Sequence, residues 1–157
     1  HRVFYKLIIL IKNIYFFYSF AGVVAGLIAH RAQQSVGTRG TILWGITLLW
    51  VGVLFIGLVP GRGTLFFFPL LSFGYYLAYV ILETVIHAKV SNRHRASVLS
   101  ASSLVASIFI LAARSGLGLM ADWVGALSAF VTWALIGGAL VPLFALLIRT
   151  IENGVAE

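Results

Sequence analysis

Residues 41–59 read TILWGITLLWVGVLFIGLV and contain no charged side chain. A helix that crosses the hydrocarbon core of a bilayer needs about 20 mostly apolar residues. The stretch is long enough for one crossing, and it is followed directly by Pro60-Gly61-Arg62-Gly63, a strong turn signal. It therefore predicts a transmembrane helix that ends in a tight turn.

Further apolar runs of similar length lie on both sides of this stretch. They cover residues 13–29, 65–88, 96–119 and 126–148. In lipid the backbone must satisfy its own hydrogen bonds, and runs this long fit helices better than the alternating segments of about ten residues that build barrels. The sequence thus predicts an all-α fold, a polytopic membrane helix bundle of about five transmembrane helices.

The two ends of the chain are more polar than the runs between them. Residues 1–12 are apolar but carry Arg2, Lys6 and Lys12, so they fit either the stub of a preceding helix or an interfacial lead-in. Residues 149–157 form a short polar tail. Because the first residue is not Met and an apolar stretch follows at once, we expect the chain to be a piece of a longer protein.

The composition supports a membrane protein and argues against an enzyme. Hydrophobic residues make up 61% and charged residues 10% of the 157 positions, whereas a soluble domain carries about 25% charged residues. There is no Cys, no phosphate-binding loop, no Ser-His-Asp order and no carboxylate pair, and His87 and His94 lack the spacing of metal ligands. We expect no catalytic residue, no cofactor and no metal.

The net charge of +7 is better explained by topology than by nucleic acid, so we expect no nucleic-acid partner. The segments at 30–40 and 88–95 and the tail hold Arg31, Arg39, Lys89, Arg93, Arg95 and Arg149. The segments at 60–63 and 119–125 hold only Arg62, although the basic residues of 1–12 fall on the same side. Since basic loops stay in the cytoplasm, the C-terminus is predicted to be cytoplasmic on either count.

The third run has a polar face. Ser72, Tyr76, Tyr79 and Glu83 follow steps of 4, 3 and 4, with Tyr75 alongside. A carboxylate within a span costs about 2.5 kcal/mol or more, so such residues usually face a cavity or a partner. We interpret this face as the lining of a solute path, and the alternative is that Glu83 only pairs with Lys89 or Arg93 at the interface.

The fourth run repeats this pattern with small hydroxyl residues. Ser100, Ser103, Ser107 and Arg114 share one face. Serines on a membrane helix are more often packing contacts than ligands, so we interpret them as a packing face. Arg114 is a candidate charge near the outer mouth of the path, and the alternative is that it extends to the interface.

The remaining runs predict scaffold. Gly22 and Gly26 in the first run form a G-x-x-x-G pair, which predicts a close-packing face. The runs at 41–59 and 126–148 have no ionisable residue, so we expect them to face lipid, and we expect Gly45 to tolerate a larger side chain better than Gly22.

Short motifs resemble the C-terminal half of bacterial major facilitator superfamily transporters. Arg95-Ala96-Ser97-Val98-Leu99-Ser100 is similar to the R-A-T/S-V-L-S run that opens helix eleven of the family. The segment from Gly118 through Asp122 to Gly125 looks like the G-x-x-A-D-x-x-G that follows it. Residues 26–39 look like a degenerate signature loop between helices eight and nine, in which His30 replaces the usual Asp.

This resemblance covers nearly the whole chain and implies helices eight to twelve of the family fold. Helices nine and twelve would face lipid, and helix ten would line the path. The implied function is secondary active transport of a small solute by alternating access, with Glu83 as a candidate proton-coupling charge. The implied partners are membrane lipid, the solute and the missing N-terminal half. The implied location is the bacterial inner (plasma) membrane.

An alternative class is a small multi-helix membrane protein that acts in interaction or assembly and does not transport. The two classes differ in what the coding sequence holds upstream of His1. Seven further hydrophobic spans there would favour the transporter, and a start codon just before His1 would favour the alternative.

The predicted topology can be tested by cysteine labelling, because the chain has no native Cys. Gln33→Cys should react with a membrane-impermeant maleimide only after the cells are opened, whereas Arg62→Cys should react in intact cells. Reaction of Gln33→Cys from outside intact cells would reverse the assignment.

Overall fold

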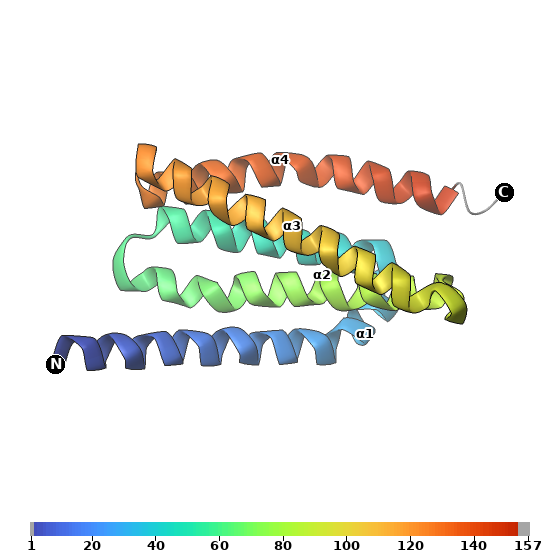
Figure 1. Cartoon of the computed structure of the whole chain (residues 1–157), viewed down its shortest axis with the longest axis horizontal. Helices are drawn as coiled ribbons and strands as arrows, with labels where there is room; N and C mark the ends of the chain where they lie inside the picture. Colours follow the sequence, from blue (N-terminus) through green and yellow to red (C-terminus); the bar gives the residue numbers. More distant parts are fainter. Residues whose placement is uncertain (1, 154–157) are drawn as a thin grey trace.

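The chain forms long helices joined by short connections (Figure 1). The computed structural model describes residues 2–153, without the side chains at 2–4, 6–10, 62, 89, 147, 148 and 150–153. The elements are α1 (Arg2–Leu58), a 3-10 helix η1 (Gly61–Phe67), α2 (Phe68–Lys89), α3 (Asn92–Val124) and α4 (Ala126–Asn153). The all-α prediction is confirmed for the described part of the chain, while residues 154–157 of the predicted tail lie outside it.

Four helical segments are long and apolar enough to cross a membrane. They are Ile11–Leu58, Gly63–Ala88, Asn92–Val124 and Ala126–Leu146. These segments are compatible with an integral membrane protein. The predicted count of about five helices is therefore corrected to four, because the runs at 13–29 and 41–59 belong to one element, α1, which reverses direction between them (Figure 1).

Gly37 is the residue at which α1 changes direction. Its backbone has φ 75° and ψ 169°, which glycine adopts without a steric penalty. The first arm (residues 2–36) and the second arm (residues 38–58) run in opposite directions on either side of it (Figure 1). The chain therefore reverses through one residue rather than through the loop predicted at 30–40.

Side chains in this polar stretch explain why it stays helical. Gln34 Nε2 lies 3.1 Å from His30 Nε2, one helical turn away, and Ser35 Oγ donates to the Ala32 carbonyl at 3.0 Å. Gln33 Nε2 donates across the reversal to Thr38 Oγ1 at 3.0 Å. The polar groups that suggested a loop thus bond along the helix and across its break.

The connections gather at the two ends of the bundle. The reversal at Gly37, the α2–α3 connection and the end of α4 lie at one end, and the start of α1, η1 and the α3–α4 junction lie at the other (Figure 1). At the first end Arg39 Nη2 donates to the Ala145 carbonyl at 3.0 Å, which ties the second arm to the distal part of α4. The basic segments that predicted the cytoplasmic side therefore share one end of the molecule.

The second arm is the central helix of the bundle. It contributes Ile42, Val53 and Ile56 to the buried apolar residues, and it packs against both α2 and α4. The expectation that the run at 41–59 serves as a lipid-facing helix is therefore corrected: it packs on two faces, while Trp44 remains 62% exposed. The apolar composition of this run does not distinguish the two environments, because helices buried between other helices and helices exposed to lipid are equally apolar in a membrane protein.

Glycines allow the second arm to approach α2 closely. A Cβ on Gly45 would lie 2.7 Å from the Ala78 backbone nitrogen and 2.8 Å from the Gly74 carbonyl oxygen. A Cβ on Gly74 would lie 2.6 Å from the Gly45 carbonyl oxygen. Neither position has room for a side chain, so this crossing requires glycine in both helices.

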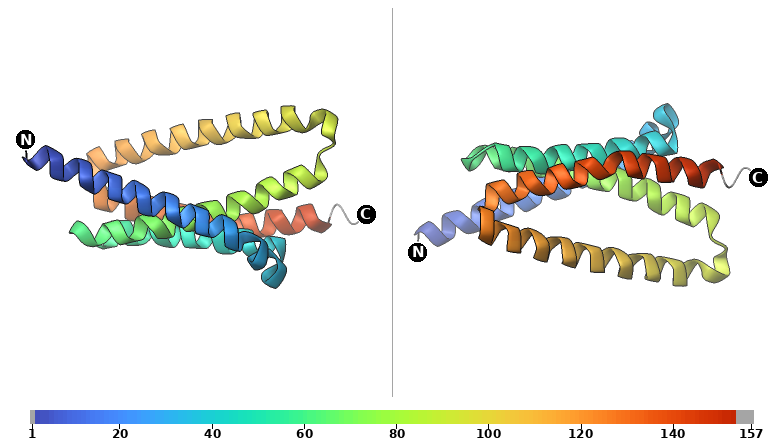
Figure 2. Two further views of the ribbon diagram at one scale, coloured as in Figure 1. Left: turned by 90° about the horizontal axis from the view of Figure 1, so that it is seen from below. Right: turned by 90° about the horizontal axis from the view of Figure 1, so that it is seen from above.

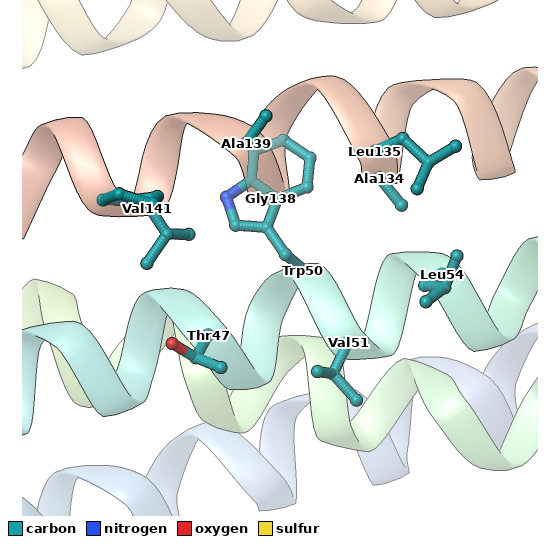
Figure 3. Close-up of a pocket in the computed structure, with 10 residues that line it drawn as sticks. Thr47, Trp50, Val51, Leu54, Ala134, Leu135, Gly138, Ala139 and Val141 are labelled. Atoms are coloured by element: carbon teal, nitrogen blue, oxygen red, sulfur yellow. The ribbon is translucent and has the colours of Figure 1, made fainter.

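The other face of the second arm packs against α4. The indole of Trp50 extends from the second arm to the α4 backbone near Gly138 and Ala139 (Figure 3). A Cβ on Gly137 would overlap this ring, and a Cβ on Gly57 would lie 2.7 Å from the Val131 backbone nitrogen. At this contact Trp50 and Val131 each pack against a glycine of the other helix, so the run at 126–148 also has a packed face.

Helix α3 stands apart from the rest of the bundle. Figure 2 shows it diverging from α2 beyond their shared connection and meeting α4 at the opposite end. No residue of α3 is buried, and its packing is mainly against α4, where Gly116 lies against Trp133. An apolar helix of 33 residues is thus exposed along most of its length.

The glycine crossing gives a direct test. Gly45→Ala should lower the free energy of unfolding by about 1–3 kcal/mol, the usual range for overpacking, because the added methyl meets α2 backbone atoms that cannot move independently. The matched control is Gly26→Ala, since nothing lies within 4 Å of its Cβ position, and it should change stability by less than about 0.5 kcal/mol.

The measurement is unfolding of the detergent-solubilised chain by SDS titration. Equal losses for the two variants would contradict the crossing as described. This ranking reverses the sequence-based expectation for Gly45, and it also corrects Gly26, which has no close neighbour although Gly22 lies under the ring of Tyr76.

Candidate functional site

The polar face of α2 begins with a structural contact. Ser72 is fully buried, and its Oγ donates to the Tyr18 carbonyl oxygen in the first arm at 2.6 Å. This hydrogen bond joins α2 to the first arm, and the buried side chain of Ser72 cannot contact a solute. The interpretation of Ser72 as a path-lining residue is wrong, because the approach of the first arm covers it.

Tyrosines from two helices form a continuous aromatic cluster next to this contact. We call Tyr18, Tyr75, Tyr76 and Tyr79 the tyrosine cluster. The ring centroids of Tyr18 and Tyr76 are 6.4 Å apart, those of Tyr75 and Tyr76 are 5.2 Å apart, and those of Tyr75 and Tyr79 are 5.8 Å apart. The cluster runs from the first arm onto α2 and ends at Tyr79, which is 43% exposed.

Glu83 lies one turn beyond the tyrosine cluster and is half-buried. Among the side chains that the structure describes, no hydrogen bond or ion pair reaches its carboxylate, and Arg93 is not bonded to it. Lys89, the other partner considered, is outside the described side chains. The carboxylate thus stands on an apolar helix without a described counter-charge.

Arg114 of α3 lies opposite the first arm. Together with Ile14, Tyr15, Tyr18 and Phe68 it lines a pocket of about 370 Å³. No ion pair to its guanidinium is found among the described side chains. Arg114 is exposed, and a charged side chain on a membrane helix is costly unless water, an anion or the interface reaches it, so this pocket is a candidate site for such a partner.

The sequence pattern did not predict that Tyr15 and Tyr18 belong with Arg114. Both tyrosines share a face of the first run with Gly22, whose pairing with Gly26 predicts packing for that face. Their hydroxyl groups within an apolar run were the available signal. The charged residue next to these tyrosines depends on the position of α3, and the local periodicity of the first run does not predict that position.

The serine stripe of α3 is not a packing face within this chain. Ser100, Ser103 and Ser107 are all exposed. Ser107 Oγ donates to the Ser103 carbonyl of its own helix at 2.8 Å, which satisfies the hydroxyl without a neighbour. The stripe is therefore uncovered among the described residues, because α3 diverges from α2 at this depth, and the packing interpretation stays a prediction.

The residues of the family-like motifs lie at the two ends of α3. Arg95 Nη2 donates to the His87 carbonyl at 3.2 Å and thereby joins the end of α2 to the start of α3, while Ala96 and Ser97 are exposed. At the other end Asp122 is exposed and Gly125, with φ 85°, terminates the helix. Arg95 and Gly125 thus have local roles at the two ends of the helix.

A second cavity is apolar. A groove of about 450 Å³ lies between the second arm and α4, with Trp50, Leu54 and Val141 in its walls (Figure 3). Thr47 is its polar lining residue, and its Oγ1 already donates to the Leu43 carbonyl at 2.8 Å. The indole N–H of Trp50 is the other polar group in its lining (Figure 3), and since no charged side chain lines the groove, it is a weaker candidate than the Arg114 pocket.

Comparisons with protein-family models, curated proteins and solved structures find no match to this chain. The resemblance to the major facilitator superfamily therefore stays a prediction. The described residues also contain no group of three or more His, Asp or Glu side chains that could hold a metal ion.

The Ser72 contact predicts a measurable difference between two serines. Ser72→Ala removes a hydrogen bond between helices and should lower the free energy of unfolding by about 0.6–1.7 kcal/mol, the range for such bonds in membranes. Ser107→Ala removes a bond within one exposed helix and should have almost no effect. SDS titration of both variants makes the comparison, and equal effects would show that the Ser72 contact contributes nothing specific.

Proposed function

We propose that the chain is the C-terminal part of a secondary active transporter of the major facilitator type, which moves a small solute by alternating access. The observation that supports this most is the half-buried carboxylate of Glu83 beside the tyrosine cluster, which has no partner among the described side chains. An ionisable group inside an apolar helix marks a solute or proton path more often than a structural element.

The family is proposed because the motifs at the two ends of α3 resemble those of the major facilitator superfamily. In this proposal Tyr75, Tyr76 and Tyr79 line the path, Glu83 is the coupling charge, and Arg114 lies toward the outer mouth. The missing N-terminal half covers the exposed side of α3. The basic end of the bundle favours a cytoplasmic C-terminus in a bacterial inner membrane.

One observation favours the alternative, a membrane interaction or assembly protein. Helix α3 exposes a long apolar surface with a serine stripe, as expected of a helix that packs against another protein. Such a protein needs no water-filled path. The two functions therefore differ in whether water reaches the tyrosine cluster from both sides of the membrane.

Cysteine accessibility tests this difference in the intact gene product without knowledge of the solute. Tyr79→Cys should react with a hydrophilic maleimide from either side of the membrane, because a path residue is exposed alternately. Trp44→Cys is the matched control, since Trp44 is 62% exposed but lines a mostly apolar pocket with Leu48 and Leu77, which a hydrophilic reagent does not enter.

The same assay tests the role of Glu83. In the Tyr79→Cys background, the ratio of inside to outside labelling should change with pH, and Glu83→Gln should abolish this change while leaving expression intact. An unreactive Tyr79→Cys, or one reactive from one side only, would favour the interaction protein. A pH response that persists in Glu83→Gln would remove Glu83 from the coupling step.

A further inference from the structure

The pocket between the first arm and α3 combines one cation with aromatic and aliphatic walls. Arg114 comes from α3, Tyr15 and Tyr18 come from the first arm, and Ile14 and Phe68 complete the lining. A volume of about 370 Å³ lies within the range of about 300–1,000 Å³ that holds small molecules in proteins.

The charge in the described lining of this pocket is positive. Its lining contains no carboxylate, and no described side chain forms an ion pair with Arg114. Asp122, on the same helix, is eight residues away, which corresponds to about 12 Å along the axis. The nearest acid in sequence is therefore too distant to neutralise the guanidinium directly.

The position of Arg114 along α3 places it inside the hydrocarbon layer, toward one edge. Helix α3 ends at Val124, and a rise of about 1.5 Å per residue places Arg114 about 15 Å from that end. Since α3 has 33 residues and is longer than the hydrocarbon layer of about 30 Å, Arg114 lies within the layer when the helix is centred in it.

We infer that this pocket binds a small amphipathic organic carboxylate, with the carboxylate at Arg114 and the apolar part against Ile14 and Phe68. The planar guanidinium offers paired N–H donors that match the two oxygens of a carboxylate. The phenol groups of Tyr15 and Tyr18 add a polar edge to the same wall. This assignment rests on the proposed function, because it makes such an anion the solute of the proposed transporter.

Benzoate is a suitable probe because it joins a carboxylate to an apolar ring. Binding of radiolabelled benzoate is measured by equilibrium dialysis on the full chain in phosphatidylcholine nanodiscs. Arg114→Gln should weaken binding at least about tenfold, as expected for loss of a charged hydrogen-bond donor. Arg114→Lys should recover part of the affinity, and benzamide, which has the same shape without the charge, should not compete.

Arg93→Gln is the matched control, since it removes a charge from an exposed position of the same helix outside the pocket. It should bind benzoate as the unchanged chain does. The proposal is overturned if Arg114→Gln binds equally well, if benzamide competes equally, or if the unchanged chain binds no benzoate. Circular dichroism and gel filtration of each variant show whether it is folded.

The phosphate of an anionic lipid offers related chemistry, and a second set of nanodiscs separates it from the solute. Adding phosphatidylglycerol should leave benzoate binding at Arg114 unchanged, and abolition of binding would assign the pocket to a lipid headgroup instead. These outcomes are independent of the accessibility assay at Tyr79. Failure of the anion site therefore leaves the proposed transporter standing, and failure of alternating access leaves a measured anion site without transport.

Discussion

The close crossing of Gly45 and Gly74 is the contact on which the rest of the bundle depends. Because neither residue has a side chain, the second arm of α1 reaches the backbone of α2. Helix association in lipid relies on van der Waals contact and hydrogen bonds rather than on exclusion of water, so close approach is its main source of stability. This crossing fixes the face that α2 turns toward the first arm, where Ser72 and Tyr76 make their contacts, and leaves the opposite side of the second arm free for Trp50 to pack on α4.

The existence of membrane-length helices could be predicted from the sequence because lipid leaves few choices. A span must be long, apolar and internally hydrogen-bonded, and all three requirements are local. The predicted count was wrong because polar residues such as His30, Gln34 and Ser35 suggest a loop, whereas their side chains bond along the helix. The lipid-facing interpretation of 41–59 was wrong because apolarity does not separate lipid from protein as a neighbour. The glycines at 45 and 52 were the better signal, since both meet α2.

The site was predictable only as far as helical periodicity extends. Steps of three and four residues placed Tyr76, Tyr79 and Glu83 on one face of α2, and this arrangement needs no knowledge of other helices. Contacts between helices were not predictable in the same way. Ser72 is covered because the first arm lies on it, and the α3 serines are exposed because that helix diverges. Three of the four neighbours of Arg114 in its pocket lie about a hundred positions earlier in the chain, where no local pattern could indicate them.

The attachment of α3 has a mechanical consequence. This helix is joined to α2 through Val90 and Ser91 and to α4 through Gly125, and it has no buried residue between these joints. A rigid rod held at both ends and unpacked along its middle cannot slide along its own axis, since short joints permit almost no translation. The displacement left to it is a sideways swing, which changes the separation between Arg114 and the first arm while the Gly45–Gly74 crossing stays in place.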